Sequence, residues 1–210
     1  MTITGAPGRP RDPEVDRRIA DAAVELFGRA GWAGFSLEAV ARQAGVGKAS
    51  IYLRWETKER LLTEALGSRL LDIADVDSGT LRGDLLELAH QMLALYLGET
   101  RQAALRMAVE APTIPGVARR WDALRESQVL TARAMVRRGI RRGEVPADTS
   151  VTLLLDTLCG GVVMHVSSAP EHLQDRLAAD LDGYADRLVD FLLRAVLAPS
   201  GPDTPGTGRG

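Results

Sequence analysis

The sequence predicts an all-α protein that consists of a small N-terminal head of three helices, in a helix-turn-helix layout, and a larger C-terminal helical body. Two observations predict this fold class. Apolar residues recur at three- and four-residue spacing along most of the 210 residues, whereas the period-two alternation typical of strands is hard to find. Clusters of Gly and Pro interrupt the helical pattern and so separate one expected helix from the next.

The first two helices of the head have recognisable ends. Asp12 is a good N-cap, Pro13 fits the first turn, and Gly31 ends the first helix. A turn then leads to Ser36, a second N-cap, which begins a short helix over Leu37–Ala44.

A turn and two further helices lead from the head into the body. Gly45 ends the second helix because glycine adopts a positive φ without strain, and a third helix fits Gly47–Trp55. Thr57 caps a connecting helix. The apolar positions of that helix are Leu61, Leu62, Ala65, Leu66 and Leu70.

The body is expected to hold five longer helices, separated by Gly- and Pro-containing breaks. They fit Leu81–Leu97, Arg101–Glu110, Val117–Arg142, Thr149–His165 and Asp175–Leu197. A polar link over Asp75–Gly79 precedes them. The predicted regions are thus a flexible arm over 1–12, a small helical head over 13–57, a larger helical body over 58–198, and a disordered tail over 199–210.

Composition excludes several classes of protein. The chain has 45% hydrophobic and 26% charged residues, as globular proteins do, and no apolar run approaches the roughly 18 residues that span a bilayer. The opening residues lack the apolar segment of a signal peptide. The single cysteine, Cys159, excludes an internal disulfide. We therefore expect a cytoplasmic protein with no membrane association.

No group of residues predicts catalysis, a metal site or a cofactor. His90, His165 and His172 lie far apart, and no two of them have the helical spacing of metal ligands. Cys159 and His165 are six residues apart, which does not place them on one helix face as a thiolate–imidazole pair requires. We therefore expect no enzymatic activity.

Positive charge is concentrated in the head, although the net charge of the chain is −2. The segment Ala39–Trp55 contains three basic residues and no acidic one. In a helix-turn-helix the second helix enters the major groove of DNA, and its N-terminal residues meet base edges. Ile51 and Trp55 have the spacing of inward residues. The residues expected to face outward are Lys48, Ala49, Ser50, Leu53 and Arg54.

The run Ala44–Tyr52, followed by Trp55 and by Lys58–Leu62, resembles the signature of the TetR family of bacterial repressors. The Ala-Gly-Val turn, the tyrosine three residues before an aromatic residue, and the Lys-Glu opening of the next helix are similar to the family pattern. Trp55 replaces the usual Phe, and Arg54 stands where smaller side chains or His are common. The resemblance implies DNA contacts by Ser36, Lys48, Ala49, Ser50, Tyr52, Arg54 and Lys58.

Each implied contact has a chemical reason. Ser36 and Lys58 lie at helix N-termini, which attract phosphate. The resemblance implies that the Tyr52 hydroxyl reaches a backbone phosphate, with a place in the small core of the head as the alternative. Lys48 is suited to guanine acceptors and Ala49 to a thymine methyl group.

The arm Gly8–Arg11 allows two interpretations. Its Gly-Arg-Pro sequence resembles arms that enter the minor groove, because arginine is attracted to the narrow groove of A·T-rich DNA. The alternative is a flexible terminus that only aids solubility.

The last helix carries apolar residues with a 4-3-4-3-4 spacing, at Leu177, Leu181, Tyr184, Leu188, Phe191 and Ala195. A core stripe within one chain and a subunit interface fit this spacing equally well. In the TetR family the last two helices of two subunits pair in a four-helix bundle, so the resemblance implies a homodimer. The interface residues expected are Leu155, Leu158, Val162, Leu181, Tyr184, Leu188 and Phe191.

Soft and aromatic side chains recur along the body, where the resemblance implies a cavity for a small apolar or amphipathic ligand. These residues are Met92, Tyr96, Met107, Trp121, Met135 and Met164. Ordinary core packing is the alternative for each of them.

Taken together, the resemblance implies a ligand-responsive dimeric transcriptional regulator, in the form of a repressor. It would bind a palindromic operator in double-stranded DNA and be released by a small-molecule inducer. The alternative is a helical ligand- or partner-binding protein without sequence-specific DNA binding.

Overall fold

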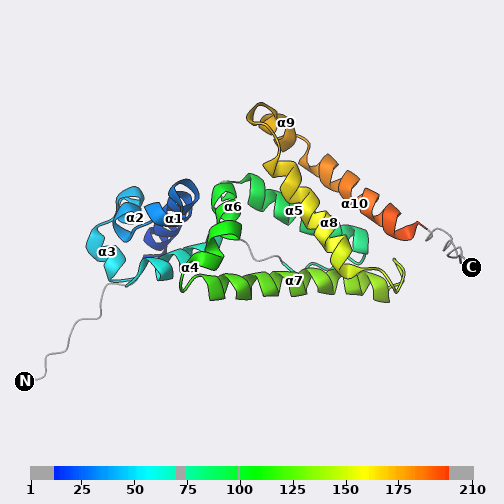
Figure 1. Ribbon diagram of the computed structural model, residues 1–210, viewed down its shortest axis with the longest axis horizontal. Helices are drawn as coiled ribbons and strands as arrows, with labels where there is room; N and C mark the ends of the chain where they lie inside the picture. Colours follow the sequence, from blue (N-terminus) through cyan, green and yellow to red (C-terminus); the bar gives the residue numbers. More distant parts are fainter. Residues whose placement is uncertain (1–11, 70–73, 99, 199–210) are drawn as a thin grey trace, which may run out of the picture. The chain divides into compact units, whose positions relative to one another are not determined.

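The computed structural model describes residues 12–69, 74–98 and 100–198, and every regular element in these ranges is a helix (Figure 1). The prediction of an all-α fold is confirmed. The arm Gly8–Arg11, Leu70 and the tail over 199–210 lie outside the described residues. Within the described ranges no helix is both long enough and apolar enough to cross a bilayer.

The described helices follow one another along the chain, with two short 3-10 turns among them. In order they are α1 (Pro13–Gly34), α2 (Leu37–Ala44), α3 (Lys48–Tyr52), α4 (Lys58–Arg69), α5 (Leu81–Leu97), α6 (Arg101–Glu110), η1 (Ala111–Thr113), α7 (Ala118–Arg141), α8 (Val151–Ser167), η2 (Glu171–Leu173), α9 (Gln174–Ala178) and α10 (Leu181–Leu197). The bounds of α2, α5 and α6 coincide with the predicted ones.

The chain divides into two compact units, which share α5 and α7 as continuous helices. The first unit comprises α1–α4, the end of α5, α6 and the first half of α7, up to residue 129. The second comprises residues 74–93 and everything from residue 130 onward. The first unit therefore extends beyond the head predicted over 13–57, because α4 and α6 both pack against α1.

Local signals set the ends of α1. The Asp12 carboxylate accepts the backbone N–H of Glu14 at 3.0 Å, so the predicted N-cap is confirmed. Gly31, where the helix was predicted to end, has a φ of +64° and a ψ of −173°, which interrupt the helix but do not end it. One further helical turn then runs to Gly34 before the chain becomes extended.

The helix-turn-helix is formed by α2 and α3. The Ser36 hydroxyl accepts the N–H of Ala39 at 3.2 Å, and Gly45 ends α2 in the left-handed region with a φ of +65°. Apart from its chain neighbours, no atom of the described residues lies within 4 Å of a Cβ built on Gly45, so its backbone conformation and not crowding requires glycine.

The third helix is shorter than predicted. It ends at Tyr52 rather than at Trp55. The N–H of Arg54 donates to the carbonyl of Ile51 at 2.9 Å, three residues earlier, which closes a tighter turn than that of an α-helix. The chain then leaves the helix toward Thr57, whose hydroxyl accepts the N–H at the start of α4, as predicted.

One continuous core holds the first unit together. Trp55 is 8% exposed, as its inward spacing predicted, and its indole N–H donates to the Glu64 carboxylate of α4 at 2.6 Å. Gly28 of α1 lets α6 approach closely, since a Cβ there would lie 3.0 Å from the backbone nitrogen of Ala103. The largest fully buried side chains of this core are Ile19, Phe27, Phe35, Ile51, Leu61, Leu62, Met107 and Ile114.

The second unit contains a buried carboxylate beside its apolar core. Asp84 of α5 is fully buried and accepts the Ser78 N–H at 2.7 Å, the Ser78 hydroxyl at 2.8 Å and the Arg142 guanidinium at 3.3 Å. These hydrogen bonds connect the segment that precedes α5 with the residue that follows α7. Fully buried apolar side chains of this unit include Leu85, Leu88, Met135, Val136, Leu158, Val162, Ala185 and Val189.

The predicted single helix over Asp175–Leu197 is wrong. The structure has two helices there, α9 ending at Ala178 and α10 beginning at Leu181. The break lies at Asp180, whose φ of −127° and ψ of 34° are not helical. Aspartate is a poor helix former, which is consistent with a break here, although the Asp180 side chain makes no capping hydrogen bond.

The ends of α8 also differ from the prediction. The helix covers Val151–Ser167 and not Thr149–His165. The Ser150 hydroxyl accepts the N–H of Leu153 at 3.3 Å, so Ser150 is the N-cap and the helix begins two residues later than expected.

Candidate DNA-binding surface

The tip of the head is formed by the N-terminal turn of α3. Lys48 and Ala49 are exposed and Ser50 is half-buried, whereas Ile51 anchors the helix in the core. Gly47 precedes α3 without a side-chain cap. The three residues predicted to meet base edges therefore lie together at the exposed start of α3, as the sequence predicted.

Tyr52 reaches outward at the end of α3, with 47% of its surface exposed. Its hydroxyl donates a hydrogen bond to the carboxylate of Glu38 on α2. This hydrogen bond lowers the pKa of Glu38 and raises the pKa of Tyr52, and the nearby Lys48 ammonium lowers the Glu38 pKa further. The alternative that Tyr52 belongs to the core does not hold.

Glu38 was missed as part of this surface. The acid-free segment considered in the sequence began at Ala39, and Glu38 immediately precedes it. Packing of α2 against α3 brings this carboxylate beside Tyr52, and a contact of that kind carries no signal in residue spacing. The exposed surface around α3 is therefore not free of acid.

Arg54 does not face outward as expected. Its guanidinium forms an ion pair with Asp16 of α1, with Nε 2.8 Å from the carboxylate, and it also donates to the Ser50 carbonyl at 3.0 Å. The side chain is 18% exposed. Arg54 thus binds the end of α3 to α1, which leaves it poorly placed to contact DNA.

Lys58 is likewise engaged within the head. Its ammonium lies 3.8 Å from the centre of the Trp32 ring and donates to the Phe35 carbonyl at 3.3 Å. The Lys58 ammonium therefore interacts with a backbone carbonyl at the end of α1 and with the Trp32 ring. Ser36 is half-buried, and its hydroxyl oxygen already accepts the capping bond.

Two exposed residues extend this surface. Leu53 follows Tyr52 and is 85% exposed. Arg42 lies exposed in the last turn of α2. The sequence had already indicated the outward position of Leu53, and an apolar side chain there is suited to thymine methyl groups.

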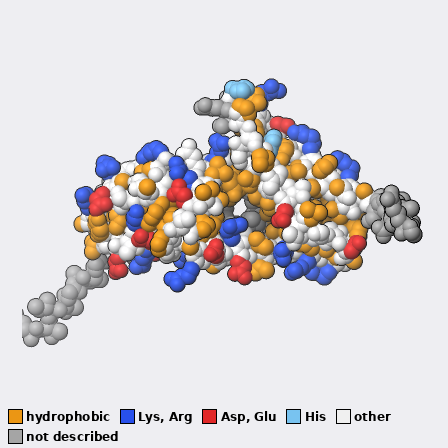
Figure 2. All heavy atoms as spheres, in the orientation of Figure 1, with side chains coloured by type: hydrophobic (Ala, Val, Ile, Leu, Met, Phe, Trp, Pro, Cys, Tyr) orange, Lys and Arg blue, Asp and Glu red, His pale blue; other side chains and the backbone are white. Residues whose placement is uncertain are grey.

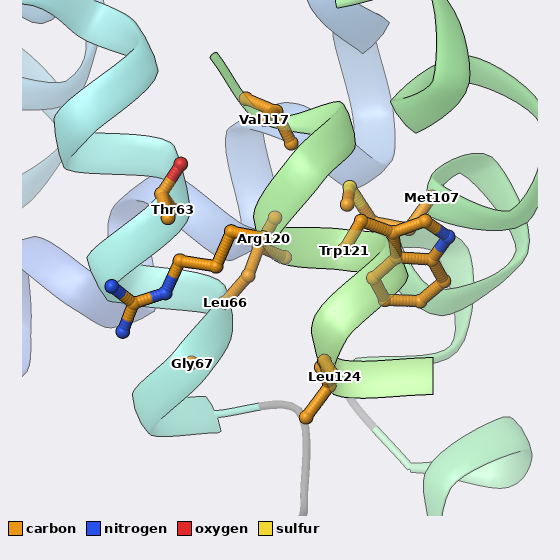
Figure 3. A pocket seen from close by; sticks show the side chains of 8 residues that line it. All are labelled: Thr63, Leu66, Gly67, Met107, Val117, Arg120, Trp121 and Leu124. Atoms are coloured by element: carbon orange, nitrogen blue, oxygen red, sulfur yellow. The ribbon is translucent and has the colours of Figure 1, made fainter. Parts of the chain in front are cut away.

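A cavity of about 150 Å³ lies behind the head, within the first unit (Figure 3). It is lined by Thr63, Leu66, Gly67, Met107, Val117, Arg120, Trp121 and Leu124. In Figure 3 the Arg120 side chain extends from α7 toward α4, while the Trp121 ring lies on the Met107 side. The lining is mostly apolar, with a hydroxyl and a guanidinium on one side.

The six residues predicted to surround a ligand are divided between the two units. Met107 and Trp121 line the cavity, and Tyr96 packs half-buried against the core of the same unit. Met92 and Met135 are buried in the second unit, and Met164 is 64% exposed on α8. Periodicity placed them all on helices of the body but gave no information on which helices meet.

The predicted interface residues differ in how far their own chain buries them. Leu158 and Val162 are fully buried and Leu155 is 7% exposed, so their prediction as interface residues is corrected: they pack in the core of their own chain. Phe191 is 60% exposed. Leu181, also an expected interface residue, is half-buried.

Tyr184 and Leu188 contact α8 of the same chain. The Tyr184 hydroxyl donates to the Gly161 carbonyl at 3.0 Å, and its ring stacks on His165 with 3.6 Å between the ring centres. A Cβ built on Gly161 would lie 3.4 Å from Leu188, so the two helices are in ordinary contact distance there. Both side chains remain half-buried.

Apolar side chains are also exposed on these two helices, where Figure 2 shows hydrophobic groups among charged ones. Leu153 of α8 is 67% exposed, and a hollow of about 640 Å³ separates it from the C-terminal half of α10. The exposed residues of α8 include Leu153, Thr157, Gly160 and Met164, at 4-3-4 spacing.

Comparison with known proteins gives matches to sequence families and to individual regulators. Residues 19–65 match the family described as "Bacterial regulatory proteins, tetR family", and residues 75–192 match "Tetracyclin repressor-like, C-terminal domain". The HTH-type transcriptional regulator AqdR of Rhodococcus erythropolis is 29% identical over 165 residues, which are 78% of this chain and 80% of that protein. The HTH-type transcriptional repressor SCO4008 of Streptomyces coelicolor is 30% identical over 156 residues, 69% and 77% of the two chains.

Solved structures share the fold. FadR from Bacillus subtilis, in complex with stearoyl-CoA, matches with a TM-score of 0.65 and 20% identity over 84% of this chain and 96% of its own. A protein of Saccharomonospora viridis in complex with choline matches with a TM-score of 0.64 and 18% identity, over 85% and 97%. The family match that begins at residue 75 alone covers more than half of the 210 residues. The chain therefore belongs to the TetR family of bacterial transcriptional regulators.

Proposed function

We propose that the protein is a repressor that binds a palindromic operator as a homodimer and releases it when a small molecule occupies the cavity behind the head. The observation that carries the proposal is the exposed N-terminal turn of α3, with Lys48 and Ala49 free on a helix that Ile51 anchors in the core. A helix held in this way is suited to entering a major groove. Such a protein acts on DNA, so its place is the cytoplasm.

The proposed roles follow the contacts of each side chain. Lys48, Ala49 and Ser50 read base edges, and Leu53 adds an apolar contact in the groove. Tyr52 donates to a backbone phosphate. Ser36, Arg54 and Lys58 hold the helices of the head in position, and their side-chain contacts within the head support that role over direct contact with DNA.

A second copy of the chain is the proposed partner of the exposed face of α8 and α10. Gly160 has open space around it, so another helix can approach there, between the apolar ends formed by Leu153 and Met164. Phe191 adds a large exposed ring. A dimer also provides the two half-sites, a DNA turn apart, that a single short recognition helix needs for tight binding.

The proposed ligand is small and amphipathic, with an apolar part against Leu66, Met107 and Trp121 and an acceptor group that meets Arg120 and Thr63. A cavity of about 150 Å³ has the size that holds a single aromatic ring. A larger ligand must move α4 away from α7. Because α4 also packs against α1, that movement changes the position of the head relative to the DNA.

Selection of bound duplexes from random DNA, repeated at several salt concentrations, tests DNA recognition. The expected result is a palindromic sequence whose affinity falls steeply with salt. Lys48→Ala should weaken operator binding about tenfold or more, because one good base contact is worth roughly 1–3 kcal/mol. Arg141→Ala, an exposed cation of the second unit, is the matched control and should change affinity less than about twofold. Binding without sequence preference would favour the alternative of a helical protein that does not read DNA.

Sedimentation tests the dimer, and a ligand series tests the cavity. Phe191→Glu should yield monomers, whereas Val109→Glu, at a position 75% exposed on α6, should not. Aryl carboxylates of increasing size should release the operator from the wild-type protein and not from Arg120→Ala. A Phe191→Glu protein that sediments as a dimer, or release that is independent of Arg120, would contradict the respective assignment.

A further inference from the structure

The recognition surface contains a carboxylate at the place where phosphate is expected. Glu38 is half-buried at the start of α2 and accepts the Tyr52 hydroxyl. A tyrosine hydroxyl has one proton and donates one hydrogen bond at a time. In the free protein that donor is therefore already occupied, by a carboxylate that also lies close enough to Lys48 to feel its charge.

We propose that Glu38 is a restraining residue: it competes with the DNA phosphate for the Tyr52 hydroxyl, so that binding exchanges one anionic acceptor for another. The inference rests on the proposed DNA-binding function and adds to it a residue that limits affinity. In this proposal the negative charge of Glu38 weakens DNA binding, whereas the basic residues around it strengthen DNA binding.

Two physical effects act in the same direction. A hydrogen bond from a hydroxyl to a carboxylate is strong, and breaking it offsets much of what Tyr52 gains from the phosphate. The carboxylate that loses its partner then remains near a phosphate of the same charge, and this repulsion is not compensated in the complex. Both effects concern the DNA backbone and not the bases, so they reduce affinity for every duplex.

The consequence is a limit on sequence-independent binding. Phosphate contacts supply nearly all of the affinity for non-specific DNA, whereas base contacts add to it at the operator. Lys48 and Ala49 keep their base contacts whether Glu38 is charged or neutral. Glu38 therefore lowers affinity for operator and random duplex by a similar factor and reduces the time the protein spends on the many competing sites of a genome.

The test measures equilibrium binding of the full chain to a selected operator and to a scrambled duplex of the same composition. Glu38→Gln should tighten binding to both duplexes about fivefold at low salt, since removal of one nearby charge is worth about 1 kcal/mol. Glu25→Gln, which removes the same charge from an exposed position on α1, is the matched control and should change either affinity less than about twofold. Equal effects of the two variants would overturn the proposal, because net charge would then explain them.

A double-mutant cycle distinguishes two roles of Glu38: competition with phosphate for the Tyr52 hydroxyl, and orientation of the Tyr52 side chain toward the DNA. Tyr52→Phe should cost little in the wild-type protein, where the phosphate bond replaces the Glu38 bond, and about threefold in the Glu38→Gln protein, where a weaker bond is lost on binding. Weaker DNA binding by Glu38→Gln would overturn the proposal and would mean that the carboxylate orients Tyr52 in the complex.

A measurement without DNA tests the pairing itself. Ultraviolet titration of the free protein should show that Glu38→Gln lowers the pKa of Tyr52, which the Glu38 hydrogen bond raises. An unchanged Tyr52 titration would overturn the inference even if DNA binds. If instead the wild-type protein binds no duplex, the proposed function fails, whereas normal DNA binding with no gain in Glu38→Gln leaves that function standing and overturns the inference alone.

Discussion

Replacing Arg106 by alanine should destabilise the first unit by about 2–3 kcal/mol. Arg106 belongs to α6 and reaches across to the interrupted end of α1, where its Nε donates to the Gly28 carbonyl at 2.7 Å and an Nη donates to the Arg29 carbonyl at 3.3 Å. The remaining Nη pairs with Glu110 at 2.9 Å. Glu110 in turn accepts the backbone N–H of Trp32 at 2.8 Å. The two side chains thereby satisfy backbone groups on both sides of the break at Gly31.

The magnitude follows from the individual contacts. A hydrogen bond that involves a charged group contributes about 1.5–3 kcal/mol, and the short bond to Gly28 is the principal one. The longer bond to Arg29 and the i,i+4 ion pair with Glu110, whose side chains are 40% and 27% exposed, add a few tenths of a kcal/mol together. The total is about 2–3 kcal/mol, which shifts a urea midpoint by roughly 1 M at a typical dependence on denaturant.

Urea unfolding followed by circular dichroism measures this loss. Arg29→Ala is the matched control, because its side chain is 61% exposed and pairs with exposed Glu25 at 3.3 Å. We expect less than about 0.5 kcal/mol from that control. If Arg106→Ala unfolds within about 0.5 kcal/mol of the wild-type protein, water replaces its bonds to α1 without loss and the reasoning is refuted.

Three further predictions concern stability. Asp84→Ala should cost about 3 kcal/mol in urea unfolding, because the Arg142 charge beside it would lose a buried partner. Gly45→Ala should cost about 1–2 kcal/mol from its left-handed backbone alone, and a cost near zero would show that α2 can end differently. The Trp32 N–H holds the pKa of Glu110 below its ordinary value, so Glu110 contributes stability above that value and loses it as the pH falls through the lowered pKa. Unfolding free energy of the wild-type protein should therefore fall with acid below about pH 4.5 more steeply than that of Glu110→Gln.

Helix ends were predictable where the signal is local. Asp12, Ser36 and Thr57 each accept the backbone bond expected of an N-cap, and Gly45 takes the left-handed conformation expected at the end of α2. A cap involves residues two or three positions apart, so the sequence contains all of the information. The break at Asp180 shows the limit of this reasoning, because apolar periodicity continued across it and concealed it.

The roles of charged residues were not predictable in the same way. Arg54 and Lys58 carry the positive charge that DNA binding requires. Within the head, however, Arg54 forms an ion pair with Asp16, and Lys58 donates to carbonyls at the end of α1. Glu38 reaches Tyr52 only through the packing of α2 on α3. Partners of this kind are fourteen or more residues away along the chain, and no spacing rule connects them.

The heptad spacing of the last helix is compatible both with a core stripe within one chain and with a subunit interface. The burial pattern of α10 explains why the spacing does not distinguish these two interpretations. The residues that α10 buries in its own chain are Ala185, Val189 and Leu192, which the spacing did not select. The selected residues lie on the neighbouring face, which ends in the 60% exposed ring of Phe191. Tyr184 and Leu188 on that face contact α8 of the same chain, so the part that the chain leaves uncovered is mainly the Phe191 ring. Covering one large side chain contributes about 1.5–3 kcal/mol, so Phe191 and Leu153 together favour association by several kcal/mol per chain before its entropic cost. The exposed Phe191 and Leu153 side chains are therefore the strongest argument within this single chain for the proposed partner.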